Sequence, residues 1–496
     1  MTQSDLRQAV HGEPALPARL EPWMSDLLTD PDTCASLLTE YGSPVNVHNF
    51  SSLQRNALEM VEAADRHGVD LRVFVARKAN KTVGLVDAVR DLGHGIDVGS
   101  HRELTQVLER GMPAERIILT AAVKTRELLH HALTHRVPVA LDNLDETTLA
   151  LQVSGDAGVS SPAVLRLAPE VRDGLTPTRF GERSSTWLNF LDSQQATDIE
   201  QRLPVVGVHF HLHGYAPQHR TTALGQAIDL VDQLRARGHR VEFIDMGGGV
   251  PMSYIDDAAA WSRFGDALHH EVLRGDDSLT WRGDGLGLYC EDHDDGPRVT
   301  GQRDTYPYHQ ELVRGEWLES VLEGEVAPGV TAAEALRQRG LSLHCEPGRS
   351  MLDGCGLTLA RVAFRKHTSD DVAVVGLEMN RTQCRSTSAD FLVDPILVRT
   401  GETGSAETGV GSHGSSDSWS APDGAFLVGA YCIEAELILK RRLHFPRGVN
   451  VGDVIALPNT AGYLMHILES ASHQIPLATN VVASGAGFIQ DAIDTW

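Results

Sequence analysis

Eight short apolar runs alternate with helical patterns along the chain, and this order constrains the fold more than any other feature. Leu224, Ile228, Val231 and Leu234, for example, fall on one face of a helix between two such runs. Eight strand–helix alternations are typical of a (β/α)8 TIM barrel, so we predict an α/β fold of this kind. The eight predicted strands are residues 71–76, 95–98, 116–120, 137–142, 163–167, 205–211, 241–246 and 341–346.

Polar residues stand at or just beyond the ends of these runs. Barrel active sites are built at the carboxyl ends of the strands, so residues at these positions are expected to converge. Turn residues alone would explain one or two such positions but not six. The residues are Lys78, Asp97, Arg166, His211, Gly247 to Gly249 and Glu346.

Composition indicates a globular protein of more than one domain. The chain has 496 residues, of which 42% are hydrophobic and 22% charged, and this length exceeds a usual single core. A formal charge of −24 opposes nucleic-acid binding, which depends on basic residues. We therefore predict no nucleic-acid partner.

The sequence also predicts a cytoplasmic protein without a membrane partner. No apolar run approaches the roughly 20 residues needed to span a bilayer, and residues 1–13 are too polar for a signal peptide. Six cysteines without a CxxC pair are expected to be reduced thiols.

A second domain follows the barrel. After Gly348 the sequence alternates in short segments at 357–365, 372–377, 426–439 and 454–457, which favours a β-domain. We expect a barrel domain over 46–350 and a β-domain formed by 1–45 and 351–496. The Gly/Ser-rich residues 401–424 are expected to form a mobile loop inside the β-domain.

An insertion is predicted near 275–325, because the stretch between the last two barrel strands is too long for a βα loop. Its Asp292-His293-Asp294-Asp295-Gly296 is similar to the start of an EF-hand loop. The later acidic ligand is missing, so a solvated acidic turn is favoured.

Three elements suggest binding of a phosphorylated aldehyde cofactor. Lys78, delivered by a strand to a polar turn, is a candidate Schiff-base former. The glycines Gly247, Gly248 and Gly249 allow backbone N–H groups to approach a phosphate. In Glu346-Pro347-Gly348-Arg349, the sharp turn lets Glu346 and Arg349 face one ligand.

Together with His209-Phe210-His211 and Gly429-Ala430-Tyr431-Cys432, these motifs resemble the fold-type III pyridoxal-phosphate enzymes of the diaminopimelate and ornithine decarboxylase family. The resemblance implies an alanine racemase-like barrel with a C-terminal β-domain, and amino-acid decarboxylation through a Lys78 Schiff base and a quinonoid intermediate. It implies that Glu346 binds the ring nitrogen and that His211 stacks on the ring. The implied cofactor-binding residues are Lys78, Asp97, Arg166, His211, Gly247, Gly248, Gly249, Glu346, Gly348, Arg349 and Tyr463.

The same resemblance implies a homodimer with shared active sites. Cys432 would reach the cleft from the β-domain of a partner subunit and return a proton to the intermediate. Glu346 favours a decarboxylase over a racemase, because a carboxylate at the ring nitrogen deepens the electron sink.

Three departures from the family pattern bear on phosphate and substrate binding. A Gly-Ser after the stacking histidine is replaced by His213-Gly214, and the function of His213 is open. The acid after Cys432 is displaced by one position to Glu434, which leaves open whether it receives a cationic substrate tail. In residues 380–395, the family's Arg-Pro and aromatic pattern is replaced by Arg381, Arg385 and Asp390, and Arg385 is expected to meet an acidic group of the substrate. The expected substrate-binding residues are Arg349, Arg385, Glu434 and Tyr463.

Three alternatives remain open. A racemase or epimerase would use Lys78 and Cys432 as opposed acid and base. A metal-dependent hydrolase would use His209 and His211, whose spacing suits a zinc pair. A cofactor-holding regulatory protein without turnover is the third, although single-barrel members of that kind lack the β-domain.

Overall fold

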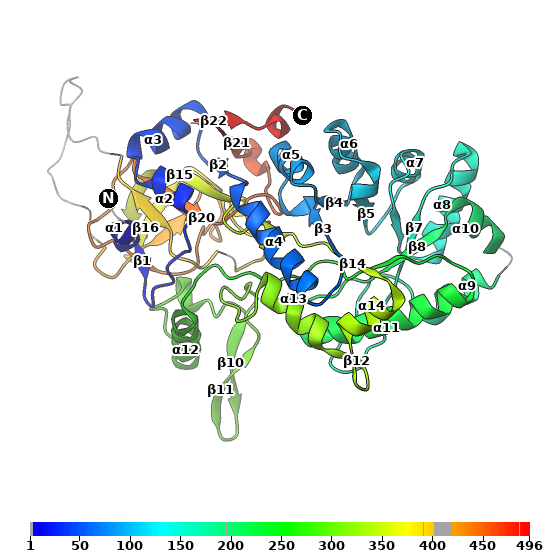
Figure 1. Ribbon diagram of the computed structural model, residues 1–496. Coiled ribbons are helices and arrows are strands. Elements are labelled where there is room, and N and C mark those ends of the chain that lie inside the picture. Colours follow the sequence, from blue (N-terminus) through cyan, green and yellow to red (C-terminus); the bar gives the residue numbers. More distant parts are fainter. Residues whose placement is uncertain (1–2, 194–195, 390, 401–418, 420, 486) are drawn as a thin grey trace. The chain divides into compact units, whose positions relative to one another are not determined.

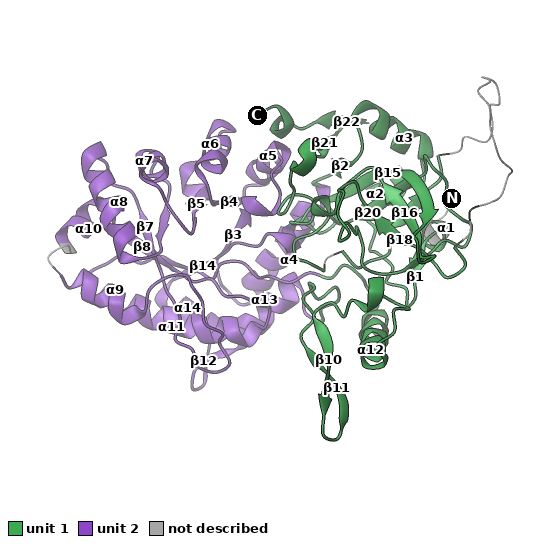
Figure 2. Cartoon of the chain, turned by 180° about the vertical axis from the view of Figure 1, so that it is seen from behind, with its two compact units in different colours: residues 1–50, 253–311, 352–496 green, residues 51–252, 312–351 purple. Residues whose placement is uncertain are grey.

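The computed structural model describes residues 3–193, 196–389, 391–400, 419, 421–485 and 487–496. The chain divides into two compact units, coloured separately in Figure 2. Unit 1 comprises residues 1–50, 253–311 and 352–496, and unit 2 comprises residues 51–252 and 312–351.

Unit 2 contains a closed barrel of eight parallel strands in the order β14-β3-β4-β5-β6-β7-β8-β9, which confirms the predicted (β/α)8 fold. Helices follow the strands along the outside of this barrel (Figure 1). The strands are β3 Leu71–Ala76, β4 Gly95–Val98, β5 Ile117–Leu119, β6 Val139–Leu141, β7 Ala163–Arg166, β8 Val205–His209, β9 Phe243–Asp245 and β14 Ser342–Cys345. The helices are α4 Ser51–Arg66, α5 Val83–Asp91, α6 His101–Glu109, α7 Arg126–Thr134, α8 Leu144–Ala157, α9 Ser184–Leu191, α10 Ala196–Arg202, α11 Pro217–Ala236, α13 Arg314–Glu323 and α14 Ala332–Arg339, with a small pair of strands, β12 Glu325–Ala327 and β13 Val330–Thr331.

The barrel interior is filled by side chains from successive strands. Phe74, Ile118, Ala140 and Val164 form a buried cluster, against which Val206 and Phe243 pack. A Cβ at Gly207 would overlap with the ring of Phe243, so this strand position must be glycine for the ring to fit. The interior is therefore a packed core, and the polar residues lie at its carboxyl end.

The sixth barrel strand is shorter than predicted. β8 ends at His209, which pairs with Asp245 at the end of β9, so there is no paired neighbour for the residues beyond Phe210. The alternating residues His209, His211 and His213 therefore do not share one face of a strand. His209 is fully buried, whereas His213 is exposed beyond the barrel.

Unit 1 contains the predicted β-domain. Its main sheet runs β17-β20-β15-β2-β21-β22, with β16 paired to β15 and β18 paired to β16. The strands of this sheet are β2 Val45–His48, β15 Gly356–His367, β16 Ala373–Leu377, β17 Ile396–Val398, β18 Phe426–Val428, β20 Val454–Pro458, β21 Thr479–Ser484 and β22 Gly487–Gln490. Other elements of unit 1 are α1 Gln3–Gln8, α2 Pro22–Leu28, α3 Pro31–Glu40, α12 Ala258–Arg274 and the paired strands β1 His11–Gly12 and β19 Leu443–His444.

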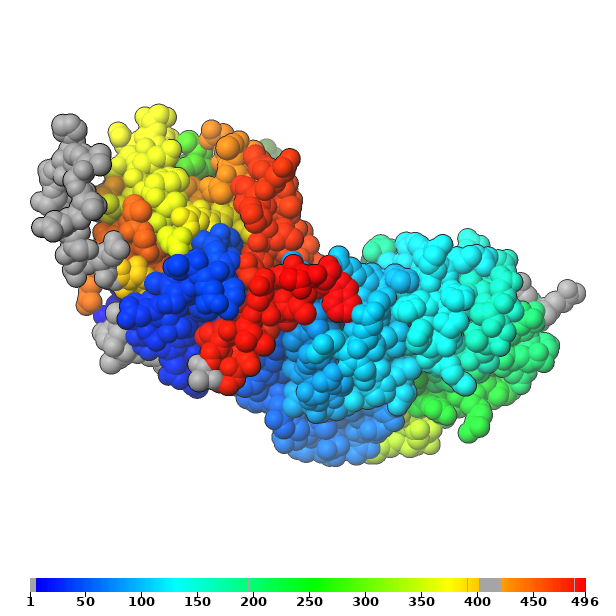
Figure 3. All heavy atoms as spheres, turned by 90° about the horizontal axis from the view of Figure 1, so that it is seen from above, coloured from blue at the N-terminus to red at the C-terminus, as the bar shows by residue number. Residues whose placement is uncertain are grey.

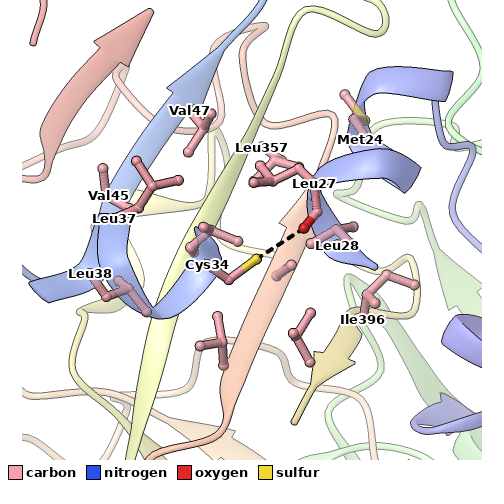
Figure 4. Close-up of a cluster of buried hydrophobic side chains, with 14 of the residues drawn as sticks. Met24, Leu27, Leu28, Cys34, Leu37, Leu38, Val45, Val47, Leu357 and Ile396 are labelled. Atoms are coloured by element: carbon pink, nitrogen blue, oxygen red, sulfur yellow. Dashed lines mark hydrogen bonds between the residues drawn. The ribbon is translucent and has the colours of Figure 1, made fainter. Parts of the chain in front are cut away.

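The N-terminal helices complete the core of this unit. Leu27 and Leu37 from α2 and α3 pack on Val47, Leu357 and Ile396 of the sheet (Figure 4). The C-terminal segment also joins the N-terminal one, because β21 pairs in parallel with β2. In Figure 3, red atoms of the C-terminal segment lie beside blue atoms of the N-terminal segment. Residues 1–50 thus belong structurally with the C-terminal third of the chain.

The segment between β9 and β14 differs from the predicted insertion within the barrel. Residues 253–311 cluster with unit 1, and 312–351 return to the barrel unit. The paired strands β10 Leu288–His293 and β11 Gly296–Gly301 form a hairpin. The acidic motif 292–296 lies at its exposed end, in agreement with a solvated acidic turn.

Two predictions for the β-domain concern residues 401–439. The segment predicted as a strand over 426–439 is a strand only at Phe426–Val428, and a turn follows at Cys432 to Glu434. Glu434 therefore lies in a turn and not on a strand. The predicted loop 401–424 falls largely outside the described residues.

Candidate active site

Lys78 lies in the 3-10 turn Arg77–Ala79 that directly follows β3. Its amine is 3.2 Å from Oδ2 of the buried Asp97 on β4, while 44% of the lysine side chain is exposed. The buried Arg77 fixes the turn by donating to the carbonyl of Asn80. An accessible amine on a rigid turn beside a carboxylate suits a lysine that reacts with a carbonyl group.

Asp97 is held between the barrel strands. The hydroxyl of Thr120 donates to its Oδ1, and Lys78 contacts its other oxygen. Burial raises the pKa of Asp97, and the positive charge of Lys78 opposes this rise. Glu103, in the first turn of α6, accepts from the backbone N–H of Gly99 at 2.7 Å, and Ser100 caps this helix.

Glu346 follows β14, and its turn is tied to the other barrel strands. Its backbone N–H donates to the carbonyl of Gly247 at 2.9 Å, and the N–H of Ala76 donates to the carbonyl of Pro347 at 3.1 Å. Burial raises the pKa of Glu346, and the charge of Lys78 is the largest effect that lowers it. The structure therefore brings Lys78 and Glu346 to the same end of the barrel.

Arg166 is hydrogen-bonded to His209, whose ring lies beside Glu346. Arg166 donates to Nδ1 of His209 at 3.0 Å, to Asp142 at 2.9 Å and to the carbonyl of Thr120 at 2.8 Å. Since a guanidinium only donates, His209 must be the tautomer protonated on Nε2. That atom lies 3.2 Å from Oε1 of Glu346.

Asp245 completes a buried group of acids below the site. It lies at the end of β9 and accepts from the N–H of Gly247 at 2.8 Å. Burial and the neighbouring Glu346 raise the pKa of Asp245 well above its usual value, whereas Lys78 and Arg166 limit the rise for Glu346. Of these two carboxyl groups, Asp245 thus has the more strongly raised pKa.

The three glycines form a turn that only glycine allows. Gly247 and Gly249 have φ values of +66° and +82°. A Cβ at Gly247 would lie 2.7 Å from the carbonyl oxygen of Phe210, and one at Gly248 would lie 2.9 Å from that of Glu346. A turn without side chains exposes backbone N–H groups to an anion, so these residues fit the phosphate of a cofactor.

His211 lies beside this glycine turn, because a Cβ at Gly247 would lie 3.0 Å from its Nδ1. Phe180 contacts the imidazole edge-on, with ring centroids 5.6 Å apart. Burial lowers the pKa of His211 to about 3, so the ring is neutral at physiological pH and its face suits stacking on an aromatic cofactor. Gly348 is buried next to Glu346, and Arg349 is half-buried at the start of the turn Arg349–Leu352.

Sequence reasoning missed Arg220, a fully buried residue in the first turn of α11. Its Nη2 donates to the carbonyls of Leu212, Gly214 and Gly248 at 3.0, 3.0 and 3.2 Å. It therefore joins the turn after His211 to the glycine turn. The only signal in the sequence is an arginine shortly after the His-rich segment, which is a weak one.

The remaining predicted residues belong to unit 1. Cys432 is exposed, and Tyr463 is half-buried with a φ of 72°. Glu434 and Arg385 line one cavity of about 660 Å³ within this unit. The cavity is also lined by the basic residues Arg282, Arg381 and Lys440.

The predicted zinc pair of His209 and His211 is not formed. Across the described ranges, one group brings three possible ligand atoms within 4.8 Å, and it consists of His209, Asp245 and Glu346 without His211. His209 has no free lone pair there, since Nδ1 accepts from Arg166 and the proton on Nε2 faces Glu346. The adjacent guanidinium charge also opposes a cation.

Comparison with known proteins agrees with this geometry. Residues 51–271 match the family described as "Pyridoxal-dependent decarboxylase, pyridoxal binding domain". The uncharacterized protein y4yA of Sinorhizobium fredii is 28% identical over 459 residues, which cover 89% of this chain and 90% of that protein. Diaminopimelate decarboxylase of Pseudomonas aeruginosa is 23% identical over 372 residues, 72% of each chain.

Solved structures show the same fold. Diaminopimelate decarboxylase from M. jannaschii in complex with L-lysine aligns with a TM-score of 0.66 and 18% identity, over 92% of this chain and 90% of that one. Lysine/ornithine decarboxylase from Vibrio vulnificus in complex with putrescine aligns with a TM-score of 0.61 and 15% identity, over 94% and 99% of the two chains.

The match over residues 51–271, the diaminopimelate decarboxylase relatives and the solved structures support a divergent member of the pyridoxal-phosphate-dependent decarboxylases of fold type III. This family assignment confirms the predicted cofactor and the predicted class of enzyme. No helix within the described residues is long and apolar enough to cross a membrane.

Proposed function

We propose that this protein is an amino-acid decarboxylase similar to diaminopimelate decarboxylase, and that Lys78 binds its cofactor covalently. The observation that carries the proposal is the position of the Lys78 amine, which is accessible, 3.2 Å from Asp97 and at the same barrel end as Glu346. Bound pyridoxal phosphate supplies an aldehyde that condenses with amines and a ring that accepts the electron pair left when a bond at Cα breaks.

The residues of unit 2 hold the cofactor in this proposal. Lys78 would hold the aldehyde through its amine. Glu346 accepts a hydrogen bond from the ring nitrogen, and His211 packs on the ring face. The N–H groups of the glycine turn, with Gly348 and Arg349, bind the phosphate. Arg166 acts through His209, because its guanidinium is occupied by protein acceptors.

The residues of unit 1 act on the substrate in a homodimer. Cys432 of one subunit returns a proton to Cα in the site of the other. Its exposure supports this role, and so do the exposed apolar side chains of Ile433, Ile467 and Leu468, at 44%, 43% and 43%. Tyr463 is proposed to contact the phosphate end and the substrate.

The substrate side chain is proposed to enter the cavity lined by Arg385 and Glu434. Arg385 is 5% exposed and donates to the carbonyls of Ser388 and Ile438 at 3.1 and 3.2 Å, so its charge is fixed in place. Glu434 is exposed. A side chain that carries an acidic group, a basic group or both would find a complementary partner there.

Cofactor attachment tests the proposal directly. Wild-type protein loaded with pyridoxal phosphate and reduced with borohydride should carry the cofactor on the peptide that contains Lys78. Lys78→Ala should lose this label and the absorption band of the attached cofactor. Lys81→Ala, three positions along the same segment, is the matched control and should keep both. A label that persists in Lys78→Ala would contradict the assignment.

A further inference from the structure

Arg220 is a buried cation placed at the glycine turn. It is 0% exposed, and its Nη2 donates to the carbonyls of Leu212, Gly214 and Gly248. A Cβ at Gly249 would overlap with the guanidinium, so the glycine turn is built around this side chain. The charge of Arg220 is therefore fixed within one hydrogen bond of the backbone that we propose binds phosphate.

Arg220 lacks a carboxylate partner among the described residues. Its Nε and Nη1 have no hydrogen-bond partner, and the neighbouring acidic group that raises its pKa is the phenol of Tyr215. Burial lowers the pKa of Arg220 to about 10, so it remains charged at neutral pH. The ring of Trp317 lies 6.0 Å from the guanidinium carbon and stabilises the charge only in part.

Burying a guanidinium without a counter-charge is unfavourable, and carbonyl dipoles offset only part of this cost. An anion held by the adjacent glycine turn would supply the missing charge. Backbone N–H groups contribute partial charges only, so a fixed cation behind them would strengthen phosphate binding considerably.

We infer that Arg220 provides the positive charge that binds the phosphate end of the cofactor, and that it does so from behind the glycine turn without touching the ligand. It also keeps the turn at Gly214 joined to the turn at Gly248. Arg220 is therefore a positioning residue with an electrostatic role. The inference rests on the proposed function, since it assumes that the glycine turn binds the cofactor phosphate.

The test compares two ligands that differ only in the phosphate. Dissociation constants of pyridoxal phosphate and of pyridoxal are measured by absorbance titration of cofactor-free protein, in wild type, Arg220→Lys and Arg220→Met. We expect Arg220→Met to bind pyridoxal phosphate about tenfold or more weakly while its affinity for pyridoxal changes less than about twofold. Arg220→Lys keeps the charge but not the planar donor group. Its affinity for pyridoxal phosphate should therefore lie between those of wild type and Arg220→Met.

Arg235→Met is the matched control, because Arg235 lies on the same helix and also donates only to carbonyls, those of Val241 and Arg339. It should leave the ratio of the two affinities unchanged. Equal weakening of both ligands in Arg220→Met and Arg220→Lys, or no weakening, would overturn the inference. Absence of covalent binding of either ligand to wild type would instead overturn the proposed function, so the two failures are distinguishable.

Discussion

Nε2 of His209 lies 3.2 Å from Oε1 of Glu346, and the hydrogen bond from Arg166 to the other imidazole nitrogen puts the ring proton on this side. His209 thus presents an N–H to the carboxylate proposed to bind the ring nitrogen of the cofactor. Both residues are buried, so little water competes for this contact. The charges of Lys78 and Arg166 oppose the rise that burial causes in the pKa of Glu346.

His209→Phe should raise the pKa of Glu346 further, because it removes an N–H dipole that lies 3.2 Å from the carboxylate and favours its ionised form. We propose that the cofactor requires the ionised carboxylate. Cofactor affinity should therefore be lost as the pH falls through this pKa, and the loss should begin at higher pH in the variant. A rise of about one unit in the pKa of Glu346 should lower the affinity about tenfold at pH values below that pKa. The measurement is the dissociation constant of pyridoxal phosphate as a function of pH. The pH is varied from about 5 to about 9, because the pKa values of buried carboxyl groups fall roughly in this range.

His209→Gln is the control for this prediction, since its side-chain amide can still donate to Glu346 and should restore part of the affinity. In a Glu346→Gln background, His209→Phe should have no further effect on the pH profile. Identical profiles for wild type and His209→Phe would contradict the proposed link.

Cys432→Ala should lower the decarboxylation rate about 100-fold or more, because a positioned proton donor contributes roughly this factor. Cys290→Ala is the matched control, since Cys290 is the other exposed thiol. It should keep wild-type turnover. The rates are measured as CO2 release under saturating substrate. Equal rates for the two variants would remove Cys432 from the mechanism.

Substrate preference should depend on Glu434 and Arg385 in opposite ways. Glu434→Gln is expected to lower kcat/KM for amino acids with a basic side chain about tenfold, through loss of a charge-assisted contact. Arg385→Met is expected to do the same for those with an acidic side chain. Competition between one substrate of each kind measures both effects in one reaction. If each variant lowered kcat/KM equally for the basic and the acidic substrate, the cavity would not be the specificity site.

His344 should make the barrel unit sensitive to acid. It stacks on Phe243 at a centroid distance of 3.9 Å, and burial lowers its pKa to about 3. The pKa of the histidine in the unfolded state is about 6.5. Below this pH the unfolded state binds a proton that the folded state does not bind, so stability is lost as the pH falls from about 6.5 toward 3. At pH 5 this loss amounts to about 2 kcal/mol.

Urea unfolding of wild type and His344→Phe at pH 7.5 and pH 5 checks this prediction. The variant is suitable because it removes the titrating group but keeps an aromatic ring. The difference in unfolding free energy between the two pH values should shrink in the variant. His213→Phe, at an exposed position, should leave the wild-type difference unchanged. An unaltered pH dependence in His344→Phe would contradict the account of His344.

Periodicity in the sequence predicted the barrel well, because buried parallel strands are continuous apolar runs whose order fixes their neighbours. All eight predicted runs contain a barrel strand, and the residues at their ends, such as Lys78 and Glu346, lie at one end of the barrel. These positions follow from chain direction alone.

Contacts between distant segments were beyond the sequence. The bond from Arg220 to Gly248 and the contacts from Arg166 through His209 to Glu346 depend on side chains from different strands and helices. The sequence around these residues has no feature that distinguishes them from ordinary surface or core residues. The clustering of 253–311 with unit 1 was missed for the same reason, since chain order places this segment between two barrel strands.

The central claim is that this protein removes the α-carboxylate of an amino acid with Lys78-bound pyridoxal phosphate. The most direct test incubates cofactor-loaded protein with L- and D-amino acids, including diamino acids, in D2O, and follows product mass and chirality. The account predicts loss of CO2 and gain of one deuteron at Cα for at least one substrate, with no reaction in Lys78→Ala. Deuterium exchange with inversion and no loss of mass would contradict it and identify a racemase.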